Sequence, residues 1–160
     1  MKKIIFFIAV AMGMLTVASA QTDIKIGIHA GIPVGDIEDG ANFKMGADFT
    51  YFWSVMDIIK AGPMVGYSHY FTEDLDGTEP DDLNFLPLGA SGRVTLGGGV
   101  FLGADLGYAI GLNDGNDGGF FYRPKLGFGF LGIGIVGSYE GINVDGVNVA
   151  SVNVGVEFGF

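Results

Sequence analysis

Residues 152–160 read VNVGVEFGF, and this stretch displays the rule that organises the whole chain. Every even position holds valine or phenylalanine, while Asn153, Gly155 and Glu157 stand at odd positions. A period of two is typical of a β-strand, because successive side chains of a strand point to opposite faces. The stretch therefore predicts a strand with one apolar face and one small or polar face.

The same alternation recurs seven times upstream of this stretch. Eight strands joined one after another predict an all-β fold, an eight-stranded antiparallel up-and-down β-barrel. The predicted strands are 23–32, 42–53, 58–71, 85–96, 100–112, 120–130, 133–140 and 151–160.

The connections between these strands alternate between longer and shorter segments. We expect tight turns at 54–57, 97–99 and 131–132. Each Asp-Gly pair falls in a longer connection, as is typical of hairpin turns that need positive φ. The longer connections are 33–41, 72–84, 113–119 and 141–147.

The composition of the non-apolar face indicates which face of the strands points into the barrel. A soluble, lipocalin-like barrel would need an outer wall with roughly 25–35% charged residues. Here the non-apolar face is mostly glycine, whereas the apolar face is continuous and aromatic towards its ends. These features favour an inside-out barrel whose apolar face meets lipid, and the soluble barrel is the less favoured interpretation.

The charged residues agree with that orientation. All six basic residues that follow position 20 fall on the predicted interior face, together with four acids. We interpret them as a structural network that neutralises and fills the lumen; a ligand-binding or conducting role is the alternative. The predicted network is Lys25, Lys44, Asp48, Lys60, Arg93, Asp105, Arg123, Lys125, Glu140 and Glu157.

Two features fit the pattern badly. Pro63, Pro87 and Pro124 lie inside predicted strands, and each predicts a bulge or a strand end. Val147 and Val149 have the opposite parity to Val152. A bulge near Ala150, or an extension beyond the bilayer, would explain that parity.

Length and composition limit the remaining classes. The chain has 160 residues, no cysteine, 29 glycines and a formal charge of −10. It therefore has the size of one domain, has no disulfide or thiolate site, and lacks the basic patches of nucleic-acid binders. A basic start, an apolar segment 4–10 and Ala18-Ser19-Ala20 predict a secretory signal peptide over 1–20. The barrel domain would then span 21–160, with export by the Sec route and cleavage near Ala20.

Signal peptide, eight alternating strands and an aromatic terminus together resemble the small bacterial outer-membrane barrels, OmpA/OmpX-like and PorT-like. Residues 152–160, with Phe158 and Phe160, look like the C-terminal assembly signal of that family. The resemblance implies a location in the bacterial outer membrane and partnership with the barrel assembly machinery. It also implies that the protein contacts outer-membrane lipids and lipopolysaccharide, and that it is a monomer. We expect no nucleic-acid partner.

In such barrels the longer loops face outward. Twelve acids and no basic residue lie in the predicted longer loops, so we expect an acidic outer rim. These acids are Asp36, Glu38, Asp39, Glu73, Asp74, Asp76, Glu79, Asp81, Asp82, Asp114, Asp117 and Asp145.

Motifs that carry chemistry are weak. His69 is expected on the lipid face near the outer rim, without a serine beside it on that face, and His29 on the interior face. The segment 74–82 is acidic, but Glu79 stands where an EF-hand loop needs glycine, so weak divalent binding is only an alternative to a solvated loop. We predict no enzyme activity, catalytic residue, cofactor or metal site.

Two functional hypotheses follow. One is a structural or surface-interaction protein with a plugged lumen, because eight strands enclose a space that side chains fill. The other is a narrow, porin-like passive conduit for small solutes, because the interior glycines leave space.

Overall fold

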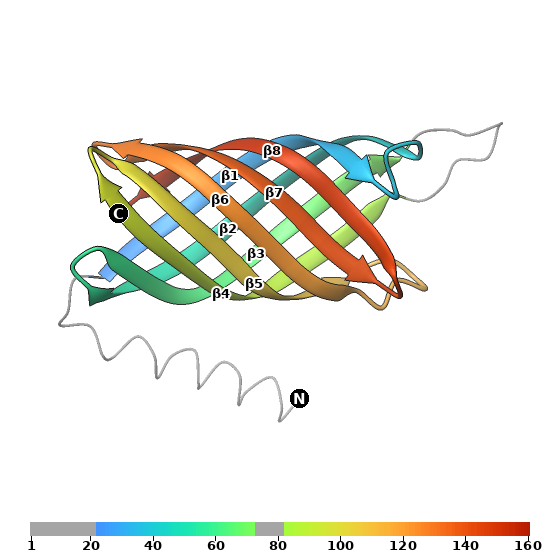
Figure 1. Cartoon of the computed structure of the whole chain (residues 1–160). Coiled ribbons are helices and arrows are strands. Elements are labelled where there is room, and N and C mark those ends of the chain that lie inside the picture. The colour runs from blue at the N-terminus through green and yellow to red at the C-terminus, as the bar shows by residue number, and fades with distance from the viewer. Residues whose placement is uncertain (1–21, 73–81) are drawn as a thin grey trace, which may run out of the picture.

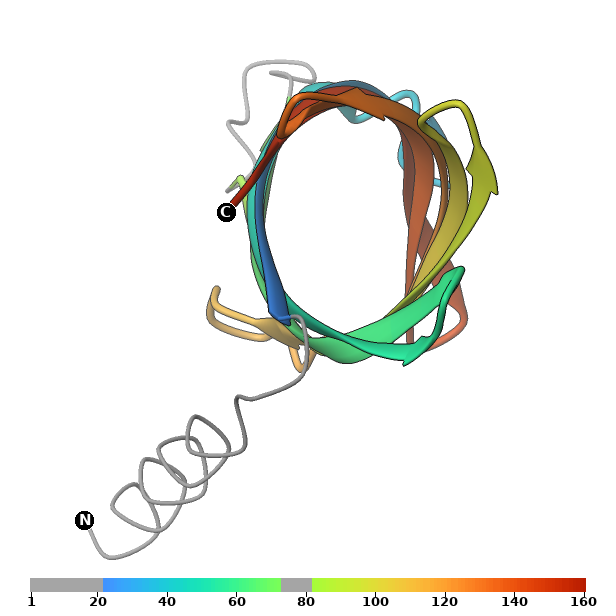
Figure 2. The same cartoon turned by 90° about the vertical axis from the view of Figure 1, so that its left-hand side faces the viewer.

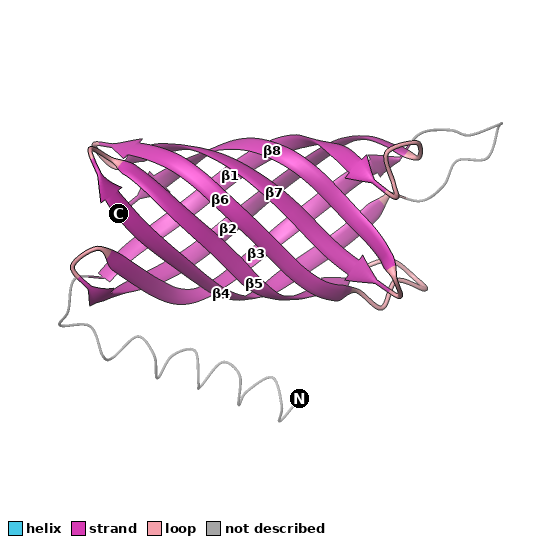
Figure 3. Ribbon diagram, in the orientation of Figure 1, coloured by secondary structure: helices cyan, strands magenta, loops and turns pink. Residues whose placement is uncertain are grey.

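The computed structural model describes residues 22–72 and 82–160. Eight antiparallel strands close into a barrel in which each strand pairs with its neighbours in sequence, and β1 pairs with β8 (Figure 1). The view turned by 90° shows the ring of strands (Figure 2), and the described segments are strands and their connections (Figure 3). The strands are β1 (Thr22–Gly35), β2 (Ala41–Met56), β3 (Ile59–Thr72), β4 (Leu83–Gly97), β5 (Val100–Gly111), β6 (Gly119–Phe130), β7 (Ile133–Val144) and β8 (Val147–Gly159).

This architecture confirms the predicted eight-stranded antiparallel barrel, and each predicted strand overlaps an observed one. Two predicted segments lie outside the described residues: the signal peptide, and the 74–81 part of the candidate calcium loop. In the described part of the chain, no helix is long and apolar enough to cross a membrane.

The two ends of the barrel differ in their connections. The short-turn end carries the turns at 57–58, 98–99 and 131–132, and the loop end carries the other four connections. The last of those four was predicted as a longer segment, 141–147, and this was wrong. It is a two-residue turn in which Asp145 and Gly146 both have positive φ, the geometry that an Asp-Gly hairpin favours.

This tight turn also resolves the parity of Val147 and Val149. Strands β7 and β8 stay in one register from Ile133↔Phe158 to Val144↔Val147, so the expected bulge near Ala150 is absent from this hairpin. The hairpin is longer than predicted, and its alternation directs Val149 into the barrel, where it is 4% exposed.

The three strand prolines cause neither a bulge nor a strand end, so that prediction was wrong. Each is paired on one side, Pro63 with Ala90, Pro87 with Ala109 and Pro124 with Ala104. On its other side the pairing skips two positions and resumes in the same register. In an antiparallel strand the N–H and C=O of one residue point towards the same neighbour. A proline therefore weakens the pairing to one neighbouring strand and leaves the other intact.

Candidate functional site

The interior of the barrel holds the candidate site, and its middle is a compact cluster of ionised groups. Lys44, Asp48, Asp105, Arg123, Lys125 and Glu140 project inward from β2, β5, β6 and β7. Three basic and three acidic groups balance in charge. We call these six residues the central charge cluster.

Glu140 organises one half of the cluster. Its Oε2 lies 2.9 Å from the Lys44 ammonium, and its Oε1 accepts hydrogen bonds from the Ser68 hydroxyl at 2.7 Å and the Tyr70 hydroxyl at 3.3 Å. The side chains of Lys44 and Glu140 are both fully buried. The carboxylate is thus supplied with partners from two other strands, as a buried charge requires.

Arg123 organises the other half. Its Nε donates to Asp105 Oδ2 at 2.8 Å, and its Nη1 lies 3.1 Å from Asp48 Oδ2. Lys125 approaches the second oxygen of Asp105 at 2.7 Å. The Arg123 guanidinium therefore connects Asp105 and Asp48, and its Nη1 also lies 3.8 Å from Glu140 Oε2; Asp105 in turn serves two cations.

His29 lies between the two halves. Its Nδ1 is 2.9 Å from Lys44 Nζ, and its Nε2 is 2.9 Å from Arg123 Nη1 and 3.4 Å from Asp48 Oδ2. A neutral imidazole has one acceptor nitrogen and one N–H. The tautomer that suits both Lys44 and Asp48 accepts at Nδ1 and donates from Nε2, and the 2.9 Å contact of Nε2 with Arg123 Nη1 is then a contact between two donors rather than a hydrogen bond.

A separate ion pair lies nearer the short-turn end. Arg93 donates through Nη1 and Nη2 to the two oxygens of Glu157, both at 2.6 Å. The guanidinium carbon lies 3.7 Å from the ring centroid of Phe101 and 5.1 Å from that of Phe52. This bidentate pair is packed between aromatic rings, a geometry that favours arginine over lysine.

The remaining two predicted network residues are at the short-turn mouth. Lys25 and Lys60 both contact Asp23, at 3.0 and 2.7 Å. Asp23 was missed in the sequence analysis, although it has the same parity as Lys25 in the first strand and could have been found on that ground. All ten predicted network residues thus lie inside the barrel, in three groups rather than in one network.

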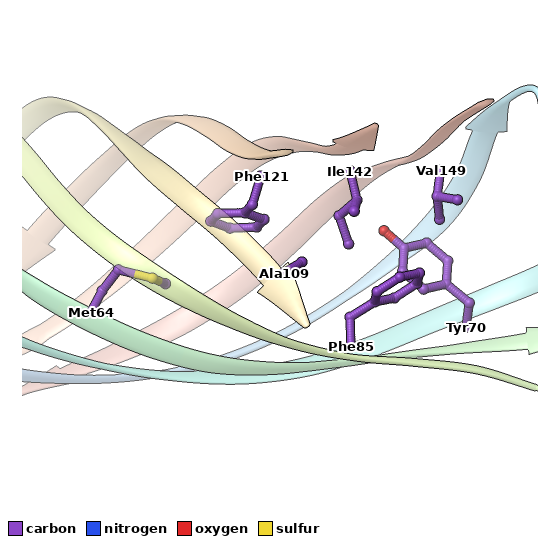
Figure 4. Packing of buried hydrophobic residues seen from close by; sticks show 7 residues of the cluster. All are labelled: Met64, Tyr70, Phe85, Ala109, Phe121, Ile142 and Val149. Carbon is purple, nitrogen blue, oxygen red and sulfur yellow. The ribbon is translucent and has the colours of Figure 1, made fainter. Parts of the chain in front are cut away.

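An apolar cluster lies inside the barrel towards its loop end, and the sequence analysis missed it as well. Tyr70, Phe85, Phe121, Ile142 and Val149 come from five different strands and point towards one another (Figure 4). Their parity places them on the interior face, but that face was interpreted as glycine and polar residues. We call these five residues the apolar plug.

Interior glycines accommodate their neighbours rather than leave space. Gly46 lies directly opposite His29, Gly127 opposite Phe101 and Gly159 opposite Lys25. In each pair a Cβ on the glycine would collide with the partner's side chain. A cavity of about 20 Å³ remains beside the central charge cluster, which is room for a single water molecule.

The histidine at the rim of the loop end has two polar partners in the described part of the chain. His69 Nδ1 lies 2.5 Å from Asn84 Oδ1, and Nε2 lies 3.2 Å from Asp82 Oδ2. The backbone N–H of Thr72 donates to Asp82, which lowers the pKa of that carboxyl below its ordinary value. Among residues 22–72 and 82–160, no group of three or more His, Asp or Glu side chains could hold a metal ion.

Comparisons with known proteins identify the fold. No protein-family model and no curated protein matches the sequence. The outer-membrane protein Ail of Yersinia pestis in a phospholipid nanodisc aligns with TM-score 0.62 and 18% identity, over 89% of this chain and 100% of that chain. The N-terminal β-barrel domain of Pseudomonas aeruginosa OprF aligns with TM-score 0.55 and 16% identity, over 89% and 100%. A de novo designed transmembrane β-barrel aligns with TM-score 0.57 and 10% identity, over 86% and 95%.

These likenesses confirm, at the level of the fold, the resemblance to the small OmpA/OmpX-like barrels. The fold is that of the eight-stranded outer-membrane β-barrels.

Proposed function

We propose that this protein spans the bacterial outer membrane as a closed barrel with a plugged lumen, and acts as a structural or surface-interaction protein. The observation that carries the proposal is the outer wall. Large aliphatic side chains on it are solvent-accessible from strand to strand, for example Ile28 at 56%, Leu126 at 56% and Val154 at 66%. A continuous apolar surface of this kind is stable against lipid and prone to aggregation in water.

Two groups of exposed aromatic side chains flank this aliphatic wall. Phe43, Tyr67, Tyr108 and Phe120 lie towards the loop end. Trp53, Phe128, Phe130 and Phe158 lie towards the short-turn end. Aromatic girdles of this kind sit at the two interfaces of a bilayer, so they support a barrel that crosses the membrane.

The interior supports a plugged lumen rather than a conduit. The apolar plug and the central charge cluster lie one behind the other along the barrel, and interior glycines such as Gly46, Gly127 and Gly159 are covered by neighbouring side chains. A passive conduit is therefore the less favoured function. The proposed role is carried by the surface, without enzyme activity.

The proposed partners follow from the two ends. The acids at the loop end, among them Asp36, Asp82 and Asp117, would face lipopolysaccharide or a surface partner. The alternating strand with Phe158 and Phe160 would engage the barrel assembly machinery during insertion, and the mature barrel would act as a monomer.

Single-channel recording in a planar bilayer tests the proposal. We expect the folded barrel to be electrically silent, and Arg93→Ala to remain silent because the apolar plug is intact in that variant. Heat-modifiable migration on a gel verifies that each sample is folded before recording. Steady conductance of the parent, increased in Arg93→Ala, would overturn the plugged lumen and make transport the leading function. Recovery of the folded protein in the soluble fraction of cells would overturn the membrane location.

A further inference from the structure

An open cavity at the short-turn end remains unexplained by the proposed function. It has a volume of about 220 Å³, and we call it the vestibule. Its lining includes Asp23, Lys25, Lys60, Arg93, Phe101 and Glu157. It is smaller than the sites of drug-sized ligands, which occupy about 300–1,000 Å³.

The charges of the vestibule do not balance. Three cations, Lys25, Lys60 and Arg93, face two carboxylates, Asp23 and Glu157. The central charge cluster, by contrast, has equal numbers of both signs. The vestibule therefore has a surplus of one positive charge, which a monovalent anion would neutralise.

Donor groups are also left over. An ammonium group has three N–H donors, and within residues 22–72 and 82–160 Lys25 and Lys60 each have Asp23 as their ion-pair partner. The buried Nε of Arg93 has no hydrogen-bond partner in the described part of the chain. Since Lys25 and Lys60 hold the same carboxylate, their two ammonium groups are close enough to hold a second one.

The lining of the vestibule also contains apolar residues. Phe101 is buried inside the barrel, whereas Phe130, Leu131 and Ile133 border the mouth of the cavity with exposed side chains. A ligand that matches this lining carries a carboxylate for the lysines and a small apolar group for Phe101 and the apolar residues at the mouth.

We propose that the vestibule binds a small monocarboxylate with an apolar substituent, with Lys25 and Lys60 holding the carboxylate and the wall around Phe101 holding the substituent. Asp23 occupies the lysines in the absence of the ligand and competes with it. This chemistry is shared by free small organic acids and by the C-terminal carboxylate of a short peptide.

Titration of the folded barrel in detergent micelles tests the proposal, with benzoate as the free acid and N-acetylalanine as the peptide terminus. For a ligand of this size we expect a Kd on the order of 1–10 mM. Chemical-shift changes should centre on the backbone amides of Lys25 and of Gly159, its cross-strand partner. Benzamide, which has the shape of benzoate without its charge, should not bind.

Three variants make the test specific. Lys60→Gln should weaken binding about fivefold or more, because one of the two ammonium groups that hold the carboxylate is lost. Asp23→Asn should tighten binding by roughly tenfold, because the competing carboxylate is removed. Asp57→Asn is the matched control, because it makes the same change at the same end of the barrel but outside the lining of the vestibule. Its binding should stay within about twofold of the parent, since exposed charges are screened.

The outcomes separate clearly. Tighter binding of benzoate than of N-acetylalanine supports free acids as the source, and the reverse supports peptide termini. Equal tightening by Asp23→Asn and Asp57→Asn would overturn the site in favour of a general charge effect. If neither the parent nor Asp23→Asn shows saturable binding, and both unfold at the same midpoint, the proposed site is overturned.

Discussion

The apolar plug and the central charge cluster fill the same barrel by opposite chemistry. The plug is held mainly by apolar packing, in which Ile142 and Phe121 are fully buried, and the hydroxyl of Tyr70 donates its hydrogen bond to the cluster. The cluster consists of ions, each of which has a partner of opposite sign within 3.1 Å. Substitutions that keep the volume of the plug should therefore cost little stability, whereas a substitution that leaves one charge of the cluster without its partner should cost much.

This difference also explains why the interior needs both. Packing at the loop end buries apolar side chains, while the ion pairs connect strands far apart in sequence, as Lys44 of β2 with Glu140 of β7. A buried ion pair adds little net stability over apolar residues of the same size, but removal of one partner is costly.

The largest expected effect is that of Glu140→Ala. It leaves the Lys44 ammonium buried without its carboxylate and removes the acceptor of Ser68 and Tyr70. We expect the free energy of unfolding to fall by about 3–5 kcal/mol. Denaturant unfolding in lipid vesicles, followed by the fluorescence of the single tryptophan, Trp53, measures it.

The double variant Lys44→Met/Glu140→Leu is the control for this prediction. It removes both charges and keeps comparable volume, so most of the lost stability should return. If Glu140→Ala unfolds at the denaturant concentration of the parent, the cluster does not act as a coupled set of charges.

The next effect is that of Ile142→Ala in the apolar plug. We expect a loss of about 2–4 kcal/mol, because truncation removes transfer energy and also leaves a cavity. Ile135→Ala, on the same strand but 62% exposed on the outer wall, is the matched control. Its cost should be smaller by about 1–2 kcal/mol, since lipid chains can fill the space that the lost atoms occupied.

Salt separates the two regions further. The loss caused by Ile142→Ala should not change between low and high salt, since packing carries no charge. A loss that shrinks with added salt would mean that the plug depends on the ion pairs beside it, and the comparison between the two regions would fail.

The smallest expected effect concerns Asp82, at the rim outside the plug. The Thr72 backbone N–H holds the pKa of Asp82 below its ordinary value, so the interaction stabilises the folded state above the pKa of the unfolded chain. This stabilisation is lost as the pH falls below about 4 and through the lowered pKa. Because the side chain is 40% exposed, the effect on unfolding should stay below about 1 kcal/mol.

The amide resonance of Thr72 reports this titration by NMR. Its chemical shift should move with a midpoint below that of an unperturbed aspartate, and Asp82→Asn should abolish the movement. A midpoint at or above the ordinary value would contradict the hydrogen bond.

The period of two in the sequence was sufficient to predict eight strands, their order and the facing of most side chains. It worked because each strand pairs with its neighbours in sequence, so local alternation and barrel topology agree. It also located Lys44, Arg123 and Glu140 on the interior face before any contact was known. Strand ends were less predictable, since β7 and β8 continue in register past the point where the apolar alternation changes sides.

Which charges meet depends on how the strands are placed in the closed barrel. Lys44 and Glu140 are 96 positions apart, and Arg93 and Glu157 are 64 apart. The odd or even position of a residue in its strand allows any interior acid to pair with any interior base, because it specifies the face of the strand and not the height along the barrel axis. The height depends on the tilt and stagger of the strands when the barrel closes. For the same reason the five residues of the apolar plug could be assigned to the interior from the sequence, but their assembly into one cluster at the loop end required the closed structure.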